Sequence, residues 1–98
     1  MKYNILWGKR ALANREQIWR YLYQEAGLDI ANAVDDRFVE ILSLLENTPK
    51  LGVKVGNQEK KRKLVLTHFP FIIVYVIESK EIKIIRILHT ARKVAARY

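Results

Sequence analysis

Two segments with a helical repeat of apolar side chains occupy the first half of the chain. Between Lys9 and Ala26 the apolar residues recur every three or four positions, which is the spacing of an amphipathic helix. Gly27 is the residue type that commonly ends such a helix. The same spacing predicts a second helix from Asp29 or Ile30 to Asn47, with Asp29 as its N-cap. Helices joined by so short a loop lie antiparallel, and each has an apolar stripe that a sheet can cover.

The second half carries short apolar runs with the composition of β-strands. Phe71–Ile77 is an unbroken run of seven apolar residues, rich in β-branched and aromatic side chains, which predicts a strand covered on both faces. The pattern resumes at Ile82–Leu88 after a short polar break, which predicts a hairpin. We expect further strands at Leu64–Thr67 and Val53–Val55, and an N-terminal strand at Tyr3–Trp7, where apolar and polar residues alternate.

The order of these elements predicts the fold class. A β-α-α-β-β-β sequence implies one α+β domain over residues 1–98, with an N-terminal strand, an α-helical hairpin and a C-terminal three-strand meander in an antiparallel sheet. Trp7, Trp19 and Tyr23 are expected to be core and helix-packing residues, in preference to a platform on which nucleic-acid bases stack. No apolar run approaches the ~20 residues of a membrane span, and no secretory signal is visible, so we expect a cytoplasmic protein without membrane contact.

Composition excludes several kinds of chemistry. The chain has no cysteine, which rules out disulfides, thiolate metal ligands and a cysteine nucleophile. Its two histidines, His68 and His89, are far from any carboxylate cluster in the sequence, so we expect neither a metal nor a cofactor. We read His68, next to Pro70, as a turn residue.

Positive charge is concentrated in the strand-rich half. Residues 1–52 carry seven basic and seven acidic side chains, whereas residues 53–98 carry eleven and three, which accounts for the net charge of +8. This asymmetry favours a negatively charged partner such as a nucleic acid or an acidic protein. The alternative is that the lysines only solubilise the strands and protect their edges from pairing.

Several motifs resemble a known family in their order and spacing. They are the segment IWRYLYQEAG, the strand FPFIIVYVIE and the segment IIRILHTARK. Together they resemble the RelE/ParE superfamily of toxins from type II toxin–antitoxin pairs, over nearly the whole chain. The Asn-x-Pro-x-x-Gly pattern that starts at Asn47 and the His-x-x-Arg pattern of His89 and Arg92 look most like the ParE branch.

The resemblance implies two alternative activities. ParE-like toxins inhibit DNA gyrase, and RelE-like toxins are endoribonucleases that cut mRNA on the ribosome. In both branches a cognate antitoxin neutralises the toxin, so a toxin–antitoxin hetero-oligomer is expected, and we expect the antitoxin's toxin-binding segment to be acidic. The chain itself is expected to be monomeric or dimeric. The ParE-like motifs favour the gyrase inhibitor, which would act by binding and not as an enzyme.

The residues that RelE-like nucleases use are only partly present. Cleavage through the 2′-hydroxyl needs a group that takes a proton and cations that hold the phosphate. The resemblance places Lys63, Arg92 and Tyr98 on such positions, and His89 is a further candidate acid or base. Two other basic positions of the nuclease pattern are Val65 and Ile72 here, which can do neither. Ribonuclease activity is therefore the second hypothesis.

The expected target-binding surface joins the basic run to the end of the last strand. Arg86 interrupts an apolar strand, and it would face the helices together with Ile82, Ile84 and Leu88 unless a bulge or a change of phase turns it outward. The surface is predicted to comprise Lys61, Arg62, Lys63, Arg86, His89, Arg92 and Lys93.

Overall fold

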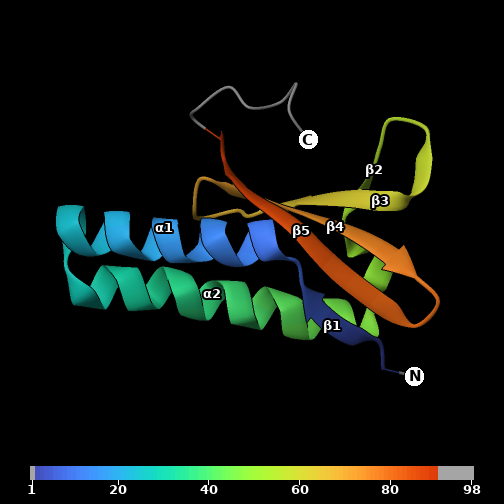
Figure 1. Ribbon diagram of the computed structural model, residues 1–98, viewed down its shortest axis with the longest axis horizontal. Helices are drawn as coiled ribbons and strands as arrows, with labels where there is room; N and C mark the ends of the chain where they lie inside the picture. Colours follow the sequence, from blue (N-terminus) through green and yellow to red (C-terminus); the bar gives the residue numbers. More distant parts are fainter. Residues whose placement is uncertain (1, 91–98) are drawn as a thin grey trace.

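The protein folds into two layers, a helical hairpin and a five-stranded sheet (Figure 1). The computed structural model describes residues 2–90. The hairpin consists of α1 (Lys9–Ala26) and α2 (Leu28–Asn47), and its closed end extends beyond the sheet. The remaining elements are β1 (Asn4–Trp7), the 3-10 turn η1 (Pro49–Leu51), β2 (Val53–Val55), β3 (Gln58–Val65), β4 (Phe71–Glu78) and β5 (Glu81–His89).

The strand order β1-β5-β4-β3-β2 confirms the predicted α+β class. The four C-terminal strands pair antiparallel with their neighbours, whereas β1 lies parallel to β5, with Asn4 opposite Glu81 and Trp7 opposite Ile84. The second helix of the hairpin brings the chain back toward β1. In the sheet, β1 is an edge strand, because it pairs only with β5. Among the described residues, no helix is long and apolar enough to cross a membrane.

The main core lies between α2 and the face of the sheet that meets the helices, which we call the inner face. Its largest completely buried side chains come from both layers and are those of Phe38, Leu45, Ile73, Tyr75, Ile82 and Ile84. A second, smaller cluster of Ile72, Val74 and Leu88 occupies the opposite, outer face. The central strand β4 is therefore buried on both faces, as its unbroken apolar run predicts.

The expected core position of Tyr23 is wrong. Trp7 does pack against the main core, but Tyr23 is 51% exposed and stacks in parallel on Trp19, with ring centroids 5.2 Å apart. The indole nitrogen of Trp19 donates a hydrogen bond to Asn32 of α2. These residues lie toward the closed end of the hairpin, which extends past the sheet, so no strand covers them (Figure 1).

Gly27 serves as both the last cap of α1 and the first cap of α2. Its φ of 94° is a conformation that L side chains rarely adopt, and its amide donates to the carbonyl oxygens of Leu22 and Tyr23. The second helix therefore begins one or two residues earlier than the sequence predicts. Asp29 lies in its first turn and is not its N-cap, although a negative charge there still interacts favourably with the helix dipole.

The third strand also begins earlier than predicted. The basic run, expected to precede the strand, forms part of β3. Successive side chains of a strand point to opposite faces, so the run is divided between the two faces of the sheet. Lys61 and Lys63 share the outer face, whereas Arg62 points to the inner face opposite Tyr75.

A β-bulge in β5 decides the orientation of Arg86. Val74 pairs with Arg86 but the next residue of β4, Tyr75, pairs with Ile84, which leaves Ile85 as the extra residue. Ile84 and Ile87 consequently both reach the main core, and Arg86 does not. The bulge therefore keeps the charged side chain of Arg86 out of the apolar core, although Ile84 and Ile87 of the same strand are buried there.

Candidate target and partner surfaces

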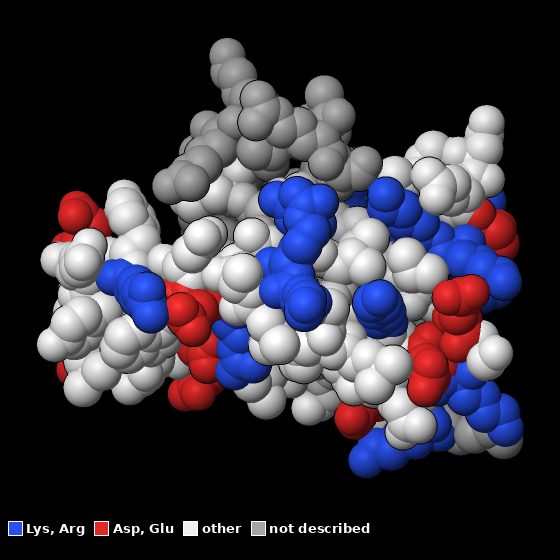
Figure 2. All heavy atoms as spheres, in the orientation of Figure 1, with Lys and Arg blue, Asp and Glu red and all other residues white. Residues whose placement is uncertain are grey.

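The outer face of the sheet carries basic side chains in rows that cross the strands. Lys61, Val76 and Lys83 form one row, and Lys63, Val74 and Arg86 form the next. Figure 2 shows basic side chains over the start of α1 and over the strands, where acidic side chains are interspersed toward the right of the view. Within the described residues, the strand register thus brings Lys61, Lys63, Lys83 and Arg86 together on the outer face.

Arg62 occupies an interior position that differs from its neighbours in the basic run. It is 8% exposed, and one of its terminal nitrogens donates a 2.8 Å hydrogen bond to the carbonyl oxygen of Gly52. The other terminal nitrogen lies 3.6 Å from a carboxylate oxygen of Glu59. These contacts give Arg62 a structural role at the base of β2, so we leave it out of the proposed target-binding set.

The row beside Lys63 is aliphatic. Val65, Ile72 and Leu88 lie side by side on β3, β4 and β5. Two of the basic positions of the nuclease pattern fall in this row, and none of its three side chains can hold a phosphate or transfer a proton. Arg92, Lys93 and Tyr98, the other sequence-predicted site residues, lie outside the described residues.

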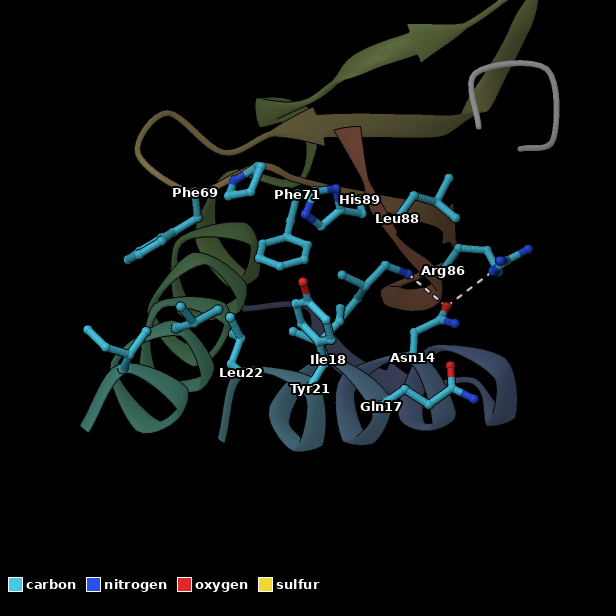
Figure 3. Close-up of a pocket in the computed structure, with 14 residues that line it drawn as sticks. Asn14, Gln17, Ile18, Tyr21, Leu22, Phe69, Phe71, Arg86, Leu88 and His89 are labelled. Carbon is cyan, nitrogen blue, oxygen red and sulfur yellow. Dashed lines mark hydrogen bonds between the residues drawn. The ribbon is translucent and has the colours of Figure 1, made fainter. Parts of the chain in front are cut away.

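A pocket of about 380 Å³ opens where the closed end of the hairpin leaves the sheet. Its walls come from α1, the start of α2, the β3–β4 loop and the end of β5 (Figure 3). Ile18, Leu22, Val34, Phe69 and Phe71 give it a mostly apolar lining. Tyr21 and Ile30, which also line it, are 51% and 48% exposed.

Asn14 and Arg86 form the polar end of this pocket. The amide oxygen of Asn14 accepts hydrogen bonds from the Nε of Arg86 and from the backbone nitrogen of Ile87, both at 3.1 Å (Figure 3). Beyond Ile84, β5 has no partner strand on this side, and Asn14 supplies the acceptor that β1 is too short to provide. Partial burial lowers the pKa of Arg86 below the ordinary arginine value, and the nearby charge of Arg10 lowers it further.

His89 joins the pocket to the end of the sheet. Its ring packs edge-to-face against Phe71, with centroids 5.2 Å apart, and it lines the pocket with Arg86. The structure therefore brings together two of the sequence-predicted residues, Arg86 and His89, and places Lys61 and Lys63 on the neighbouring strands. Within residues 2–90 no cluster of three His, Asp or Glu side chains is arranged to hold a metal ion.

Sequence reasoning missed the residues that α1 contributes. Asn14, Gln17 and Tyr21 interrupt or flank the apolar stripe of the helix, and all three line the pocket. A partial signal existed for Asn14, because a polar amide beside a buried stripe usually needs a hydrogen-bond partner. The exposed aromatic Tyr21, one turn from Ile18 and Gln17, gave no signal distinct from the core pattern.

Comparison with known proteins identifies the family. Residues 5–94 match the family described as "ParE toxin of type II toxin-antitoxin system, parDE". A solved structure titled "Chromosomal ParDE TA system from P. aeruginosa" has the same fold, with a TM-score of 0.77 and 24% sequence identity over 90% of this chain and 96% of that chain. No curated protein gives a significant match. Since the family match spans nearly the whole chain, the protein belongs to the ParE family of type II toxins.

Proposed function

We propose that this toxin inhibits DNA gyrase by binding to it and not by cleaving RNA. Besides the family, the observation that supports this is the aliphatic row of Val65, Ile72 and Leu88 beside Lys63. A nuclease needs groups that hold the phosphate and move protons, and this row supplies none. Inhibition by binding requires only complementary surfaces, and basic side chains on the outer face are suited to a negatively charged region of the target.

A supercoiling assay with purified gyrase tests this function. We expect the protein to reduce supercoiling and to accumulate cleaved DNA that remains bound to gyrase. Lys61→Glu should weaken the inhibition, because it reverses a charge on the outer face. Arg20→Glu is the control, since Arg20 is on α1 and its charge is already compensated by Glu16 at 2.9 Å. Normal supercoiling in the presence of excess protein would contradict the proposal.

One observation favours the alternative, a ribosome-dependent mRNA endoribonuclease. Lys63 lies in the same cross-strand row as Arg86, so two cations of the kind that hold a phosphate are adjacent to Val74 on the outer face. Primer extension on transcripts isolated after induction would then map new breaks, and Lys63→Gln would abolish them. An intact transcript pool in growth-arrested cells excludes this activity.

We also propose that a cognate antitoxin neutralises the toxin in the cytoplasm and occupies the pocket. The apolar lining, with Arg86 and Asn14 at one end, is suited to an amphipathic segment that ends in a carboxylate. Such a segment would bury Tyr21 and Ile30, which the toxin alone leaves half-exposed. A toxin–antitoxin hetero-oligomer is the assembly expected.

Two half-exposed β-branched apolar positions on α2 give a matched test of that placement. Ile30 and Val39 are each 48% exposed, but only Ile30 lines the pocket. Titration calorimetry with the product of the neighbouring reading frame should show weaker binding for Ile30→Asn and unchanged binding for Val39→Asn. Equal affinities of the two variants would place the antitoxin elsewhere.

A further inference from the structure

The described lysines and arginines differ in whether a carboxylate compensates their charge. Many are within ion-pair distance of an acidic side chain, and these are Lys2, Arg15, Arg20, Arg37, Lys54 and Arg62. Lys9, Lys50, Lys60 and Lys80 have no ion pair with any residue between positions 2 and 90, and the same is true of four cations that follow one another across the outer face and the start of α1, namely Arg10, Lys61, Lys83 and Arg86. We call these four residues the cationic ridge.

The ridge runs from the outer face of the sheet to the start of α1. Lys61 and Lys83 lie on either side of Val76 in one cross-strand row. The backbone nitrogen of Gly8, which caps α1, donates a 2.8 Å hydrogen bond to the carbonyl oxygen of Ile84. A Cβ atom on Gly8 would lie 3.5 Å from the Cε of Lys83, so that lysine extends across the beginning of the helix.

Arg10 and Arg86 complete the ridge on its helical side. Arg10 precedes Asn14 by one helical turn, and Asn14 accepts the hydrogen bond from Arg86. The two guanidinium groups are close enough for Arg10 to lower the pKa of Arg86. The first turn of α1 contains no acidic residue, so nothing there offsets the positive end of the helix dipole.

A negatively charged partner would neutralise the positive charge that this arrangement concentrates. Like charges held together repel, and the other arginines of the fold show that the sequence supplies carboxylates where charge has only a structural role. Cations at intervals along a ridge are suited to a polyanion with regularly spaced charges.

We infer that Arg10, Lys61, Lys83 and Arg86 form a phosphate-binding ridge that contacts the backbone of duplex DNA. Its biological setting rests on the proposed function, because gyrase holds duplex DNA and a bound inhibitor lies beside it. The ridge would position the toxin on the gyrase–DNA complex without reading base sequence, since phosphate contacts carry no sequence information directly.

Fluorescence anisotropy with a short labelled duplex, in the absence of gyrase, tests this inference. We expect the full-length protein to bind with a dissociation constant on the order of 10⁻⁵ M, and the affinity to fall steeply with salt. About 0.9 counterion is released per phosphate contact, so the ridge predicts a log–log slope of roughly 3 to 4. Arg10→Gln and Lys83→Gln should each reduce the slope by about one. Arg20→Gln, whose charge Glu16 already compensates, should leave it unchanged.

The outcomes separate this inference from the proposed function. Slopes that are equal in the wild type and both ridge variants would overturn it, as would competition by polyglutamate that equals competition by unlabelled DNA at the same charge concentration. A protein that inhibits gyrase but does not bind duplex DNA at 50 mM salt, where such binding is strong, refutes the ridge alone. A protein that binds DNA through the ridge but leaves supercoiling unchanged supports the ridge and refutes gyrase inhibition.

Discussion

The hydroxyl of Tyr75 fixes Gly52 to the central strand of the sheet. It accepts a hydrogen bond from the backbone nitrogen of Gly52 and donates one to the carbonyl oxygen of Pro49, each at 2.8 Å. Arg62, opposite Tyr75 in the neighbouring strand, donates to the carbonyl oxygen of the same glycine. The Asn-x-Pro-x-x-Gly pattern of the sequence therefore marks the place where the chain leaves α2 and is attached to the sheet.

Gly52→Ala should destabilise the fold. An added Cβ would lie 2.6 Å from the carbonyl oxygen of Lys63 and 2.8 Å from the Tyr75 hydroxyl, and neither backbone nor buried phenol can move away easily. We expect a loss of about 1–3 kcal/mol in urea denaturation, which is the usual cost of overpacking. Val53→Ala, at a 59% exposed position next to it, is the control and should change the unfolding free energy little. Equal stabilities of wild type and Gly52→Ala would mean that β2 sits farther from β3.

Tyr75→Phe should reduce the unfolding free energy by about 1–3 kcal/mol, because it leaves the Gly52 nitrogen and the Pro49 carbonyl without their partner.

Tyr75 also makes the stability of the protein depend on pH. Burial raises the pKa of Tyr75 above its ordinary value of 10.0, so its contribution is complete below that pH. It is lost as pH rises through the higher folded value, because the unfolded chain releases the proton first. In denaturation curves, the wild type and Tyr75→Phe should therefore differ by a constant unfolding free energy below about pH 10, and the difference should shrink as the pH rises above that value.

The contact between Arg15 and Asp35 should contribute more than an ordinary surface ion pair. Its two hydrogen bonds, at 2.6 and 2.8 Å, join α1 to α2, and the guanidinium group also lies 4.9 Å from the ring centre of Trp7. The hydrogen bond to Asp35 raises the pKa of Arg15. A double-mutant cycle should give a coupling of about 1 kcal/mol, against a few tenths for the exposed pair of Arg20 and Glu16. Similar couplings for the two pairs would show that the bidentate geometry adds nothing.

Asn14→Ala should loosen the end of β5. The substitution removes the acceptor of the Ile87 amide and of Arg86, so hydrogen exchange at Ile87 should accelerate, with a stability loss of roughly 1–2 kcal/mol. Asn32→Ala is the matched control, since its amide accepts only the exposed Trp19 bond. Unchanged protection at Ile87 would mean that solvent replaces Asn14 without cost.

Charge reversal near the end of the chain is predicted to reduce toxicity. Arg92→Glu or Lys93→Glu should weaken growth inhibition more than Arg20→Glu, because the sequence-predicted target-binding set includes Arg92 and Lys93 but not Arg20. Plating efficiency after induction, with protein levels matched by immunoblot, measures the effect. Equal effects of the three substitutions would remove the case for a working surface at this end.

The elements whose ends carry a special residue were predictable from the sequence. Gly27 marks the boundary between the helices, and the first helix has the predicted bounds. The start of β3 was not predictable, because consecutive charged residues hide the alternation that marks a strand. The sequence indicated only that a bulge was possible. The apolar pattern shows that Arg86 is out of place in the strand, but it does not show which residue of β5 is the extra one.

The candidate sites were less predictable than the fold. The basic residues of the strands predicted a charged surface. The placement of Arg62 on the opposite face from Lys61 and Lys63 depends on the register of β3. The pocket depends on how far the hairpin extends past the sheet, which no local pattern encodes. For the same reason Tyr23 carries the helical spacing of a core residue but has no strand beneath it.

The projecting end of the hairpin also affects how long the toxin remains active when no partner is bound to it. Tyr21, Tyr23, Leu28 and Ile30 each leave about half of their surface in water, all near the turn between the helices. A molecule that exposes several large apolar side chains in one region tends to self-associate. The amount of active toxin would then be limited by this loss, and it would depend on how quickly free molecules reach their target.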